Sequence, residues 1–295
     1  MTILPNSSSP QAKTKQIHEI NIIKLIILPL GIILLVTFCL APLLWQFLTS
    51  IKVNQDISSL PNIYFPRRYT LDHYINLFTS RPLVHYIFNS AFVSIASTLL
   101  CLGIGTPAAY ALARLTLRGE KIILAGIIII TLFPFILIFL GLLEIIQILK
   151  LGNNYISLIV SYTAINIPLT LLVMRSFFQQ LPRELEDAAQ VDGYSTWQML
   201  IQILLPLTVP ALVTTGILTF IFAWNEFILA LTFISQESMK TLPVAAAQLS
   251  GSLGKEIPYG AIAAMTVIGT FPLVVLVMFF QGKIVQGLTS GAVKG

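Results

Sequence analysis

Charged residues are scarce in this chain. Only 10% of its 295 residues are Asp, Glu, Lys or Arg, whereas 56% are hydrophobic, and the mean hydropathy is +0.87. Such a chain has too few polar side chains to cover the surface of a water-soluble globule. The composition therefore excludes an ordinary soluble domain and predicts an integral membrane protein.

Cysteine and histidine are also rare. Both cysteines, Cys39 and Cys101, fall within apolar runs, where neither a disulfide nor a thiolate metal site is expected. The three histidines, His18, His73 and His85, are too dispersed to suggest a metal or catalytic cluster. We expect no metal site and no cofactor bound by this chain.

Signals for binding nucleotides and nucleic acids are missing as well. The segment 251–255 has the wrong spacing for a phosphate-binding loop and lacks the Ser or Thr that would contact magnesium. The net charge of +5 comes from basic residues scattered between apolar segments rather than gathered in a stripe. The chain is therefore not expected to hydrolyse ATP, to act as an enzyme or to bind nucleic acid.

Long apolar segments recur along the whole chain. A helix needs about 20 apolar residues to cross a hydrocarbon core of roughly 30 Å. Six windows reach that length, at residues 25–48, 84–113, 122–148, 155–175, 203–225 and 260–281. These windows predict an all-α fold, a polytopic membrane domain of six transmembrane helices over residues 25–285, between an N-terminal tail at 1–24 and a C-terminal tail at 286–295.

The distribution of basic residues predicts the orientation. Six spans place both termini on one side of the membrane. With that side inside, ten of the 17 basic residues lie in the inner segments and seven in the outer ones. This weak positive-inside bias predicts that both termini are cytoplasmic.

Proline occurs often within or beside the spans. Each proline removes one helix hydrogen bond and favours a kink. The prolines are Pro29, Pro42, Pro107, Pro134, Pro168, Pro206, Pro210 and Pro272. Kinks tolerated by bundle packing and kinks that serve as hinges are both open interpretations.

Polar groups inside the spans are few. Glu144, close to the outer end of the third span, is the one acid clearly inside a span, and it is expected to reach toward the headgroups, with a pore-facing role as the alternative. Ion-coupled transport is therefore not favoured. Asn89, Thr98, Asn166 and Asn225 could line a path by hydrogen bonding without charge selectivity, or could hold neighbouring helices together.

An acidic insert interrupts the apolar pattern between the fourth and fifth spans, at residues 181–206. Pro182 suits the first residue of a helix, and acids such as Asp187 follow where the positive helix end favours them. Gly193 can end that helix in a left-handed conformation. The insert is therefore predicted to open with a helix at about 182–193.

A second helix and a negative charge complete the insert. Ser195 and Gln198 have the spacing of a capping box, which opens a helix running to Leu205 and Pro206. Residues 182–192 carry one arginine against four acids, a net charge of −3. An anionic inner leaflet would repel that charge. The insert is therefore expected to dock onto a cytoplasmic protein rather than to lie on lipid.

The insert also carries a recognisable motif. Residues 187–206 follow the pattern E-A-A-x3-G-x9-I-x-L-P, with Asp187 in place of the usual Glu. The matching residues are Ala188, Ala189, Gly193, Ile203, Leu205 and Pro206. This motif resembles that of ATP-binding-cassette importer permeases. The resemblance extends over nearly the whole chain and is strongest to the sugar (carbohydrate type 1) family, in which the chain is similar to the second permease of maltose transporters.

The resemblance implies three contact regions: a coupling helix seated in an ATPase cleft, a C-terminal segment that reaches the ATPase dimer, and a loop that probes the binding protein. The implied ATPase-coupling residues are Glu186, Asp187, Ala188, Ala189, Asp192, Gly193, Leu205 and Pro206. The implied C-terminal ATPase contacts are Thr289, Ser290, Gly291 and Lys294. The implied binding-protein loop residues are Gln248, Ser250, Gly251, Gly254 and Lys255.

The resemblance also implies partners and a function. The partners are a homologous second permease in a heterodimer, two ATPase subunits that hold ATP and Mg²⁺, an extracytoplasmic solute-binding protein and the lipid of a bacterial inner membrane. The implied function is to form half of the translocation path for a neutral sugar, glycoside or sugar-derived compatible solute. A self-contained secondary transporter and a non-transporting docking subunit are the alternatives.

Overall fold

Helices form most of the described chain. The computed structural model describes residue 25 and residues 27–249 and 257–290. Within these ranges, β-structure is limited to an isolated bridge between Lys52 and Tyr69. The all-α prediction is therefore confirmed.

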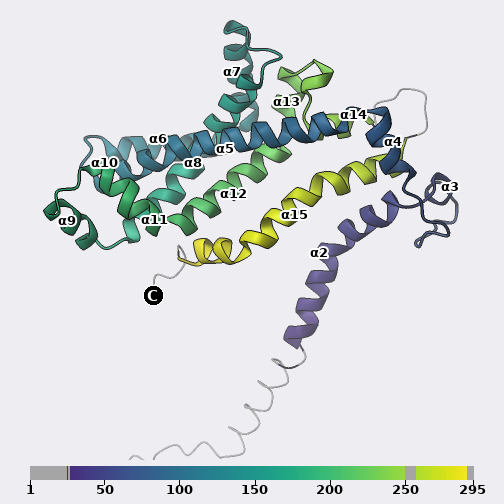
Figure 1. The fold of residues 1–295 in the computed structure, drawn as a ribbon, viewed down its shortest axis with the longest axis horizontal. Helices are drawn as coiled ribbons and strands as arrows, with labels where there is room; N and C mark the ends of the chain where they lie inside the picture. The colour runs from purple at the N-terminus through teal and green to yellow at the C-terminus, as the bar shows by residue number, and fades with distance from the viewer. Residues whose placement is uncertain (1–24, 26, 250–256, 291–295) are drawn as a thin grey trace, which may run out of the picture.

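Long helices and short connecting helices follow one another along the chain (Figure 1). The long ones are α2 (Leu28–Ser50), α5 (Leu83–Arg114), α8 (Tyr155–Gln180), α12 (Val209–Asn225) and α15 (Tyr259–Ser290). Between them lie α3 (Asn54–Ile57), α4 (Asp72–Ser80), α6 (Glu120–Leu132), α7 (Phe135–Ile148), α9 (Glu184–Val191), α10 (Thr196–Met199), the π-helical turn η2 (Leu200–Leu204), α11 (Leu205–Leu207), α13 (Ile228–Phe233), the 3₁₀ turn η3 (Glu237–Met239) and α14 (Leu242–Leu249).

Four of the described helices are long and apolar enough to cross a membrane, namely α2, α5, α8 and the part of α15 from Tyr259 to Lys283. They correspond to the predicted spans at 25–48, 84–113, 155–175 and 260–281. Each of the two other predicted spans is a bent pair of helices. The described chain thus has four unbroken spans, or up to six spans if each bent pair counts as one.

The third predicted span is broken at Pro134. α6 and α7 meet at an angle of 99°, and Phe133 between them has an extended backbone with a ψ of 141°. Proline disfavours a helical conformation in the residue before it and has no N–H to donate. The predicted kink is confirmed here, whereas Pro107 and Pro168 lie inside unbroken helices.

The fifth predicted span is bent as well. The helical run Thr196–Leu207 meets α12 at an angle of 81°. The bend is at Thr208, whose ψ is 8°, with Pro210 shortly after it and η2 shortly before it. Prolines and π-helical turns are common causes of helix kinks. The predicted insert therefore enters the bundle at an angle to the span that follows it.

α5, α8 and α12 form the centre of the bundle. α5 and α8 approach each other closely at Gly105, where an added Cβ would lie 2.6 Å from Cγ2 of Thr170. Glycine allows two membrane helices to come this near. We call the end of the bundle that carries α9 the α9 end, and the opposite end, beside α14, the α14 end (Figure 1).

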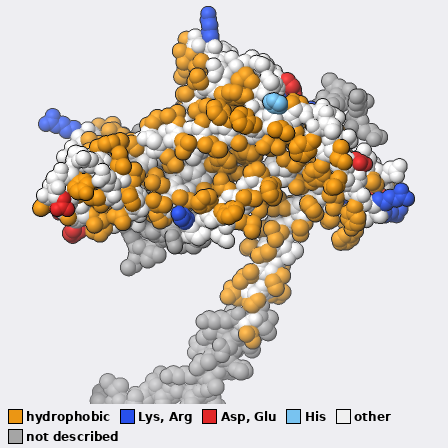
Figure 2. Space-filling model, in the orientation of Figure 1, with side chains coloured by type: hydrophobic (Ala, Val, Ile, Leu, Met, Phe, Trp, Pro, Cys, Tyr) orange, Lys and Arg blue, Asp and Glu red, His pale blue; other side chains and the backbone are white. Residues whose placement is uncertain are grey.

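α2 stands apart from the other helices along most of its length (Figure 1). Of its 23 residues only Ser50, at its C-terminal end, is buried. Figure 2 shows apolar side chains over the middle of the molecule, with most of the visible charged side chains at the α9 end, beside α3 and α4, and at the tip of α7. Apolar surface of this extent needs lipid or protein around it, as expected for a membrane domain.

Candidate functional site

The acidic insert forms a short helix, α9, at the α9 end. α9 begins at Glu184, because the first helical hydrogen bond runs from the Glu186 N–H to the Arg183 carbonyl at 2.9 Å. The prediction that Pro182 is the first helical residue was therefore wrong by two positions. The acids lie in the first turn, where the helix dipole stabilises negative charge.

Gly193 ends α9 as predicted. Its φ is +82°, a left-handed conformation that is unfavourable for a residue with a side chain. The Tyr194 N–H donates to the Ala189 carbonyl at 3.0 Å, and the Gly193 N–H donates to the Gln190 carbonyl at 3.1 Å. This pair of bonds is a Schellman motif, which satisfies the last carbonyls of the helix. The turn after α9 is therefore specified locally.

The predicted capping box is present at the start of α10. The Ser195 hydroxyl accepts a hydrogen bond from the Gln198 N–H at 3.3 Å, and the Gln198 side-chain oxygen accepts one from the Ser195 N–H at 3.0 Å. These two bonds satisfy backbone donors that a helix start leaves open. The helix–turn–helix form of the insert is confirmed.

One face of the insert is exposed. The predicted coupling residues on this face are Asp187, Ala188, Asp192, Gly193 and Pro206. Two apolar side chains are exposed beside them, Val191 at 88% and Trp197 at 60%. The sequence-based prediction of the coupling residues did not include these two. Large apolar residues within a polar insert could have indicated them. Exposed apolar groups next to acids are typical of a protein-binding surface.

The opposite face of the insert belongs to the bundle. Ala189 is 2% exposed and packs in a cluster with Phe178, and Leu205 is partly buried against the same cluster. Glu186 faces the end of α5, where the Arg114 Nε lies 2.8 Å from the Glu186 Oε1, with side chains 6% and 13% exposed. Glu186, Ala189 and Leu205 of the predicted coupling set therefore contact their own chain.

Gln248, from the implied binding-protein loop, is near the end of α14. Its side-chain oxygen accepts a hydrogen bond from the Lys240 Nζ at 2.8 Å, and Lys240 also pairs with Glu237. Hydrogen bonds from Lys240 and from the Tyr86 hydroxyl lower the pKa of Glu237. The other residues of that loop prediction, Ser250, Gly251, Gly254 and Lys255, lie outside the described residues.

Two of the four predicted path residues are buried. Asn89 is 2% exposed, and its amide donates to the carbonyls of Ser238 and Lys240, each at 2.9 Å. Asn166 is 4% exposed, and its amide donates to the Tyr162 carbonyl of its own helix at 2.8 Å. Asn89 therefore makes a contact between segments of the kind that the sequence left as the alternative, whereas the bond of Asn166 stays within α8.

The other two predicted path residues differ in exposure, because Thr98 is buried and Asn225 is exposed. Thr98 lines a groove of about 330 Å³ between α5, α12 and α15. Asn225 is exposed at the end of α12, and its amide donates to the Ile221 carbonyl at 2.8 Å. A path-lining role for Thr98 and Asn225 stays a prediction.

Glu226 is a buried acid that the sequence reading did not single out, whereas Glu144, which it did, is exposed on α7. The Glu226 carboxylate accepts hydrogen bonds from the N–H groups of Leu229 at 2.9 Å and Ala230 at 3.1 Å, and from the Tyr162 hydroxyl at 2.9 Å. It therefore caps α13 and links it to α8. In the described ranges, no group of three or more His, Cys, Asp or Glu could hold a metal ion.

Two of the four implied C-terminal ATPase contacts lie among the described residues. Thr289 and Ser290 are the last residues of α15, so the first part of the expected C-terminal tail continues that helix. Gly291 and Lys294 lie outside the described residues, as does the expected N-terminal tail at 1–24.

Comparison with known proteins finds relatives over most of the chain. The model of the family described as "binding-protein-dependent transport system inner membrane component" matches residues 102–290. The sulfoquinovosyl glycerol transport system permease protein SmoH of Agrobacterium fabrum is 40% identical, over 87% of this chain and 89% of that protein. The trehalose transport system permease protein SugB of Mycobacterium tuberculosis is 37% identical, over 89% and 95%. The trehalose/maltose transport system permease protein MalG of Thermococcus litoralis is also 37% identical, over 93% and 99%.

Two solved structures share the fold. A bacterial ABC transporter involved in the import of the acidic polysaccharide alginate has a chain that matches with a TM-score of 0.74 and 21% identity, over 94% of this chain and 99% of that one. A bacterial alginate ABC transporter in complex with an alginate pentasaccharide-bound periplasmic protein matches with a TM-score of 0.65 and 18% identity, over 90% and 94%. At these identities the likeness establishes the fold alone.

Proposed function

The chain belongs to the family of binding-protein-dependent transport system inner membrane components, and we propose that it forms half of the translocation path of an ATP-driven importer for a neutral sugar, glycoside or sugar-derived compatible solute. It is an ABC importer permease of the sugar type. As such it is a membrane subunit rather than an enzyme, and ATP hydrolysis lies on separate partner subunits.

The exposed face of the insert is the observation that carries the coupling part of this proposal. Asp187 and Asp192 offer negative charge, and Val191 offers an apolar anchor between them. A complementary cleft on an ATPase subunit would bury the apolar group and pair the acids with basic residues. α9 is therefore the coupling helix, and the α9 end is the cytoplasmic end.

The inner face of α9 supports a lever mechanism. Because Glu186 and Ala189 are packed into the bundle, closure of an ATPase pair on ATP would move α9 and the bundle together. Such a rigid-body movement can switch a permease pair between inward-facing and outward-facing states. ATP binding would in this way open the path to the binding protein.

The groove that Thr98 lines supports a neutral solute. It lies between α5, α12 and α15, and its described lining contains no charged side chain. A charged solute in such a groove would lose its hydration without gaining a counter-charge. Hydroxyl groups of a sugar could instead bond to the exposed amide of Asn225. The Thr98 hydroxyl is buried without a hydrogen-bond partner, and it could bond to a sugar once the helices move apart.

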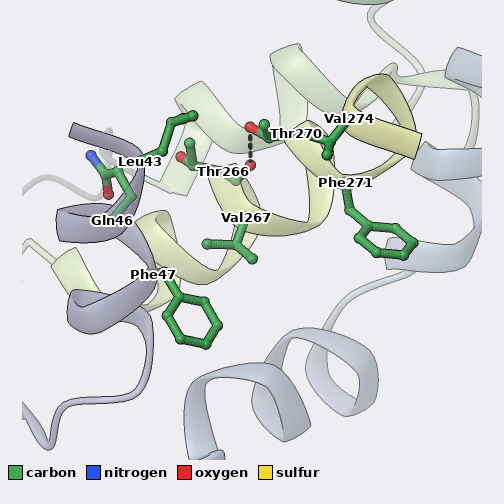
Figure 3. Close-up of a pocket in the computed structure, with 8 residues that line it drawn as sticks. All are labelled: Leu43, Gln46, Phe47, Thr266, Val267, Thr270, Phe271 and Val274. Carbon is green, nitrogen blue, oxygen red and sulfur yellow. Dashed lines mark hydrogen bonds between the residues drawn. The ribbon is translucent and has the colours of Figure 1, made fainter. Parts of the chain in front are cut away.

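A second groove supports pairing with a homologous permease. It has a volume of about 190 Å³ and lies between α2 and α15, where Phe47 and Phe271 point outward (Figure 3). The Thr270 hydroxyl on its wall already donates to the Thr266 carbonyl at 2.8 Å, so the groove offers an apolar surface. Since α2 has few contacts elsewhere, a second permease is proposed to cover it, within a complex that also contains two ATPase subunits.

The opposite end of the bundle is proposed to face the binding protein. Gln248 is held there by Lys240, so the loop that follows it starts from a fixed position. With the α9 end in the cytoplasm, the α14 end is extracytoplasmic and both chain termini are cytoplasmic. The membrane is then a bacterial inner membrane.

Reconstitution tests the proposed function. The permease, its partner permease, the ATPase and the binding protein are placed in proteoliposomes with trehalose, maltose or sulfoquinovosyl glycerol, the solutes in the relatives' names. Because sulfoquinovosyl glycerol carries an anionic sulfonate, uptake of that solute alone would contradict the neutral-solute part of the proposal. We expect the loaded binding protein to stimulate ATP hydrolysis and uptake to require ATP. Asp187→Lys should abolish the stimulation, whereas Asp72→Asn, an exposed acid at the other end, should not.

Two outcomes would support the alternatives instead. Uptake that persists without ATP while an ion gradient is intact would indicate a secondary transporter. Co-purification of the subunits without stimulated hydrolysis or uptake with any of the three solutes would indicate a docking subunit.

A further inference from the structure

α5 is bonded to other segments at both of its ends. It runs without a break from Leu83 to Arg114 and extends from the α14 end to the α9 end (Figure 1). The proposed movement of α9 needs a rigid connection to the bundle. The contacts of α5 identify the residues that provide it.

At the α9 end, Arg114 makes two contacts with the coupling segment. Its Nε lies 2.8 Å from the Glu186 Oε1, and its Nη2 donates to the Leu181 carbonyl, which precedes α9. The Tyr110 hydroxyl approaches the other oxygen of the Glu186 carboxylate at 3.5 Å. The contact between the Arg114 Nε and the Glu186 Oε1 is an ion pair without hydrogen-bond geometry, and its attraction is strengthened because water is excluded. The directional contact is the charge-assisted hydrogen bond from the Arg114 Nη2 to the Leu181 carbonyl. Arg114 therefore sets the position of both the entry to α9 and its first turn.

At the α14 end, α5 holds the segment that leads to Gln248. The Asn89 amide bonds to two carbonyls of that segment, and its own oxygen accepts a hydrogen bond from the Tyr155 hydroxyl at 2.8 Å. The Ser90 hydroxyl accepts a hydrogen bond from the Leu242 N–H at 2.8 Å. Because Lys240 of the same segment bonds to Gln248, a displacement of this end of α5 would also displace Gln248.

Between its ends, α5 is packed against α8. At Gly105 the two helices approach so closely that an added Cβ would lie 2.6 Å from the Thr170 Cγ2. Pro107 does not break the helix. Closely packed elements do not deform continuously, so they carry displacements as a body.

We propose that Arg114 and Glu186 are positioning residues of the transporter, which make α9 and α5 move as one body so that α5 carries the movement to the segment that holds Gln248. This rests on the proposed importer function and adds the residues that transmit the movement within this subunit. Glu186 is then occupied within its own chain, and Asp187 and Asp192 are the acids that face the ATPase.

A distance between spin labels directly tests whether α9 and α5 are rigidly connected. In the complete transporter, with the two native cysteines of this chain replaced by serine, Gln190→Cys on α9 and Ile104→Cys on α5 carry the labels; both positions are exposed. We expect the same narrow distance distribution in the nucleotide-free state and in the state trapped with ATP and vanadate. Arg114→Gln should broaden and shift it, and the exchange of charges in the double variant Arg114→Glu, Glu186→Arg should restore a narrow distribution.

A second ion pair provides the matched control. Arg175 and Glu120 lie 2.7 Å apart and join α8 to α6. Glu120→Gln breaks this pair but keeps Arg175, whose Nε donates to the Leu112 carbonyl of α5 at 3.1 Å, so it should leave the label distance unchanged. A distance that differs between the two states of the otherwise unaltered transporter, or one that Arg114→Gln leaves unchanged, would overturn the proposal.

The efficiency of transport tests the whole connection. For Arg114→Gln we expect the number of solute molecules taken up per ATP hydrolysed to fall by about fivefold or more. Combining it with Asn89→Ala should cause little further loss, because both changes break one connection. Independent, multiplying losses would contradict a role for α5. An unaltered transporter without ATP-driven uptake would contradict the importer function. The label distances would still decide whether α9 and α5 are rigidly connected.

Discussion

The Tyr162 hydroxyl donates a hydrogen bond to the Glu226 carboxylate at 2.9 Å, which links α8 to the break between α12 and α13. The same carboxylate accepts the N–H groups of Leu229 and Ala230 at the start of α13. A single side chain therefore compensates for the backbone hydrogen bonds that are lost where α12 ends.

Removal of the Glu226 carboxylate is expected to destabilise the protein. Glu226→Ala leaves buried N–H groups without acceptors, and each such group costs about 1–3 kcal/mol. Tyr162→Phe removes one donor and should cost only about 1 kcal/mol. The midpoint of thermal unfolding of the purified complex measures both effects. Glu144→Gln, at an exposed acid of α7, is the control, and a Glu226→Ala variant as stable as this control would refute the capping role.

Gly193 is expected to tolerate no branched side chain. Its φ of +82° is left-handed, so Gly193→Val should cost about 2 kcal/mol locally and disturb the turn after α9. We expect normal insertion into the membrane but a loss of coupled transport, measured as solute taken up per ATP hydrolysed. Gly126→Ala, at a helical glycine with open space around it, should transport normally. Normal coupling in Gly193→Val would count against the lever mechanism.

The contact between Gly105 and Thr170 predicts a specific rescue. Gly105→Ala places a methyl group 2.6 Å from the Thr170 Cγ2, and overpacking of this kind costs about 1–3 kcal/mol. Thr170→Ser removes that Cγ2 and keeps the hydroxyl that lies 3.1 Å from the Cys101 sulfur. The double variant should therefore recover part of the lost thermal stability. Gly103→Ala, on the same helix but with open space, should be neutral, and equal losses at both glycines would disprove the contact.

The Glu237 carboxylate is expected to make stability depend on pH in the acid range. Hydrogen bonds from Lys240 and Tyr86 lower its pKa in the native state. Its stabilising contribution is therefore complete above the unfolded pKa, about 4.3, and is lost as the pH falls through the lower native pKa. The stability difference between the unaltered protein and Glu237→Gln should be constant between about pH 6 and 8 and shrink below about pH 4. The effect is small because the side chain is 55% exposed.

The partner of Glu237 supplies the control for this titration. Lys240→Gln removes the first of the two hydrogen bonds that lower the pKa, so the loss of stability should begin at a higher pH. A difference that grows as the pH falls would have the wrong sign for a carboxylate with a lowered pKa.

Local signals in the sequence predicted those parts of the structure that depend on a few neighbouring residues. The capping box at Ser195, the left-handed turn at Gly193 and the kink at Pro134 each follow from backbone chemistry within a short segment. The bounds of α5 differ by one residue at each end from the predicted span. For the bounds of α5, the length of the apolar run is sufficient information.

Contacts between distant residues could not be predicted in this way. The motif places acids on both faces of α9, and only the packing of α5 decides that Glu186 faces inward while Asp187 faces outward. The burial of Glu226 has a similar origin, because its donors include a hydroxyl from α8. Polar residues at the ends of apolar segments are ambiguous until their neighbours are known, as Asn89 and Asn225 illustrate.

The isolation of α2 has a consequence for how the protein is made. Its main neighbour in the described structure is α15, which is synthesised after the other described helices. Since chains are synthesised from the N-terminus, α2 has to enter the bilayer and persist there while the rest of the protein is still being translated. Its 23 residues are almost wholly apolar, so the helix is stable in lipid before α15 has been synthesised. α2 therefore gains its main contact within this chain only after α15 has been synthesised.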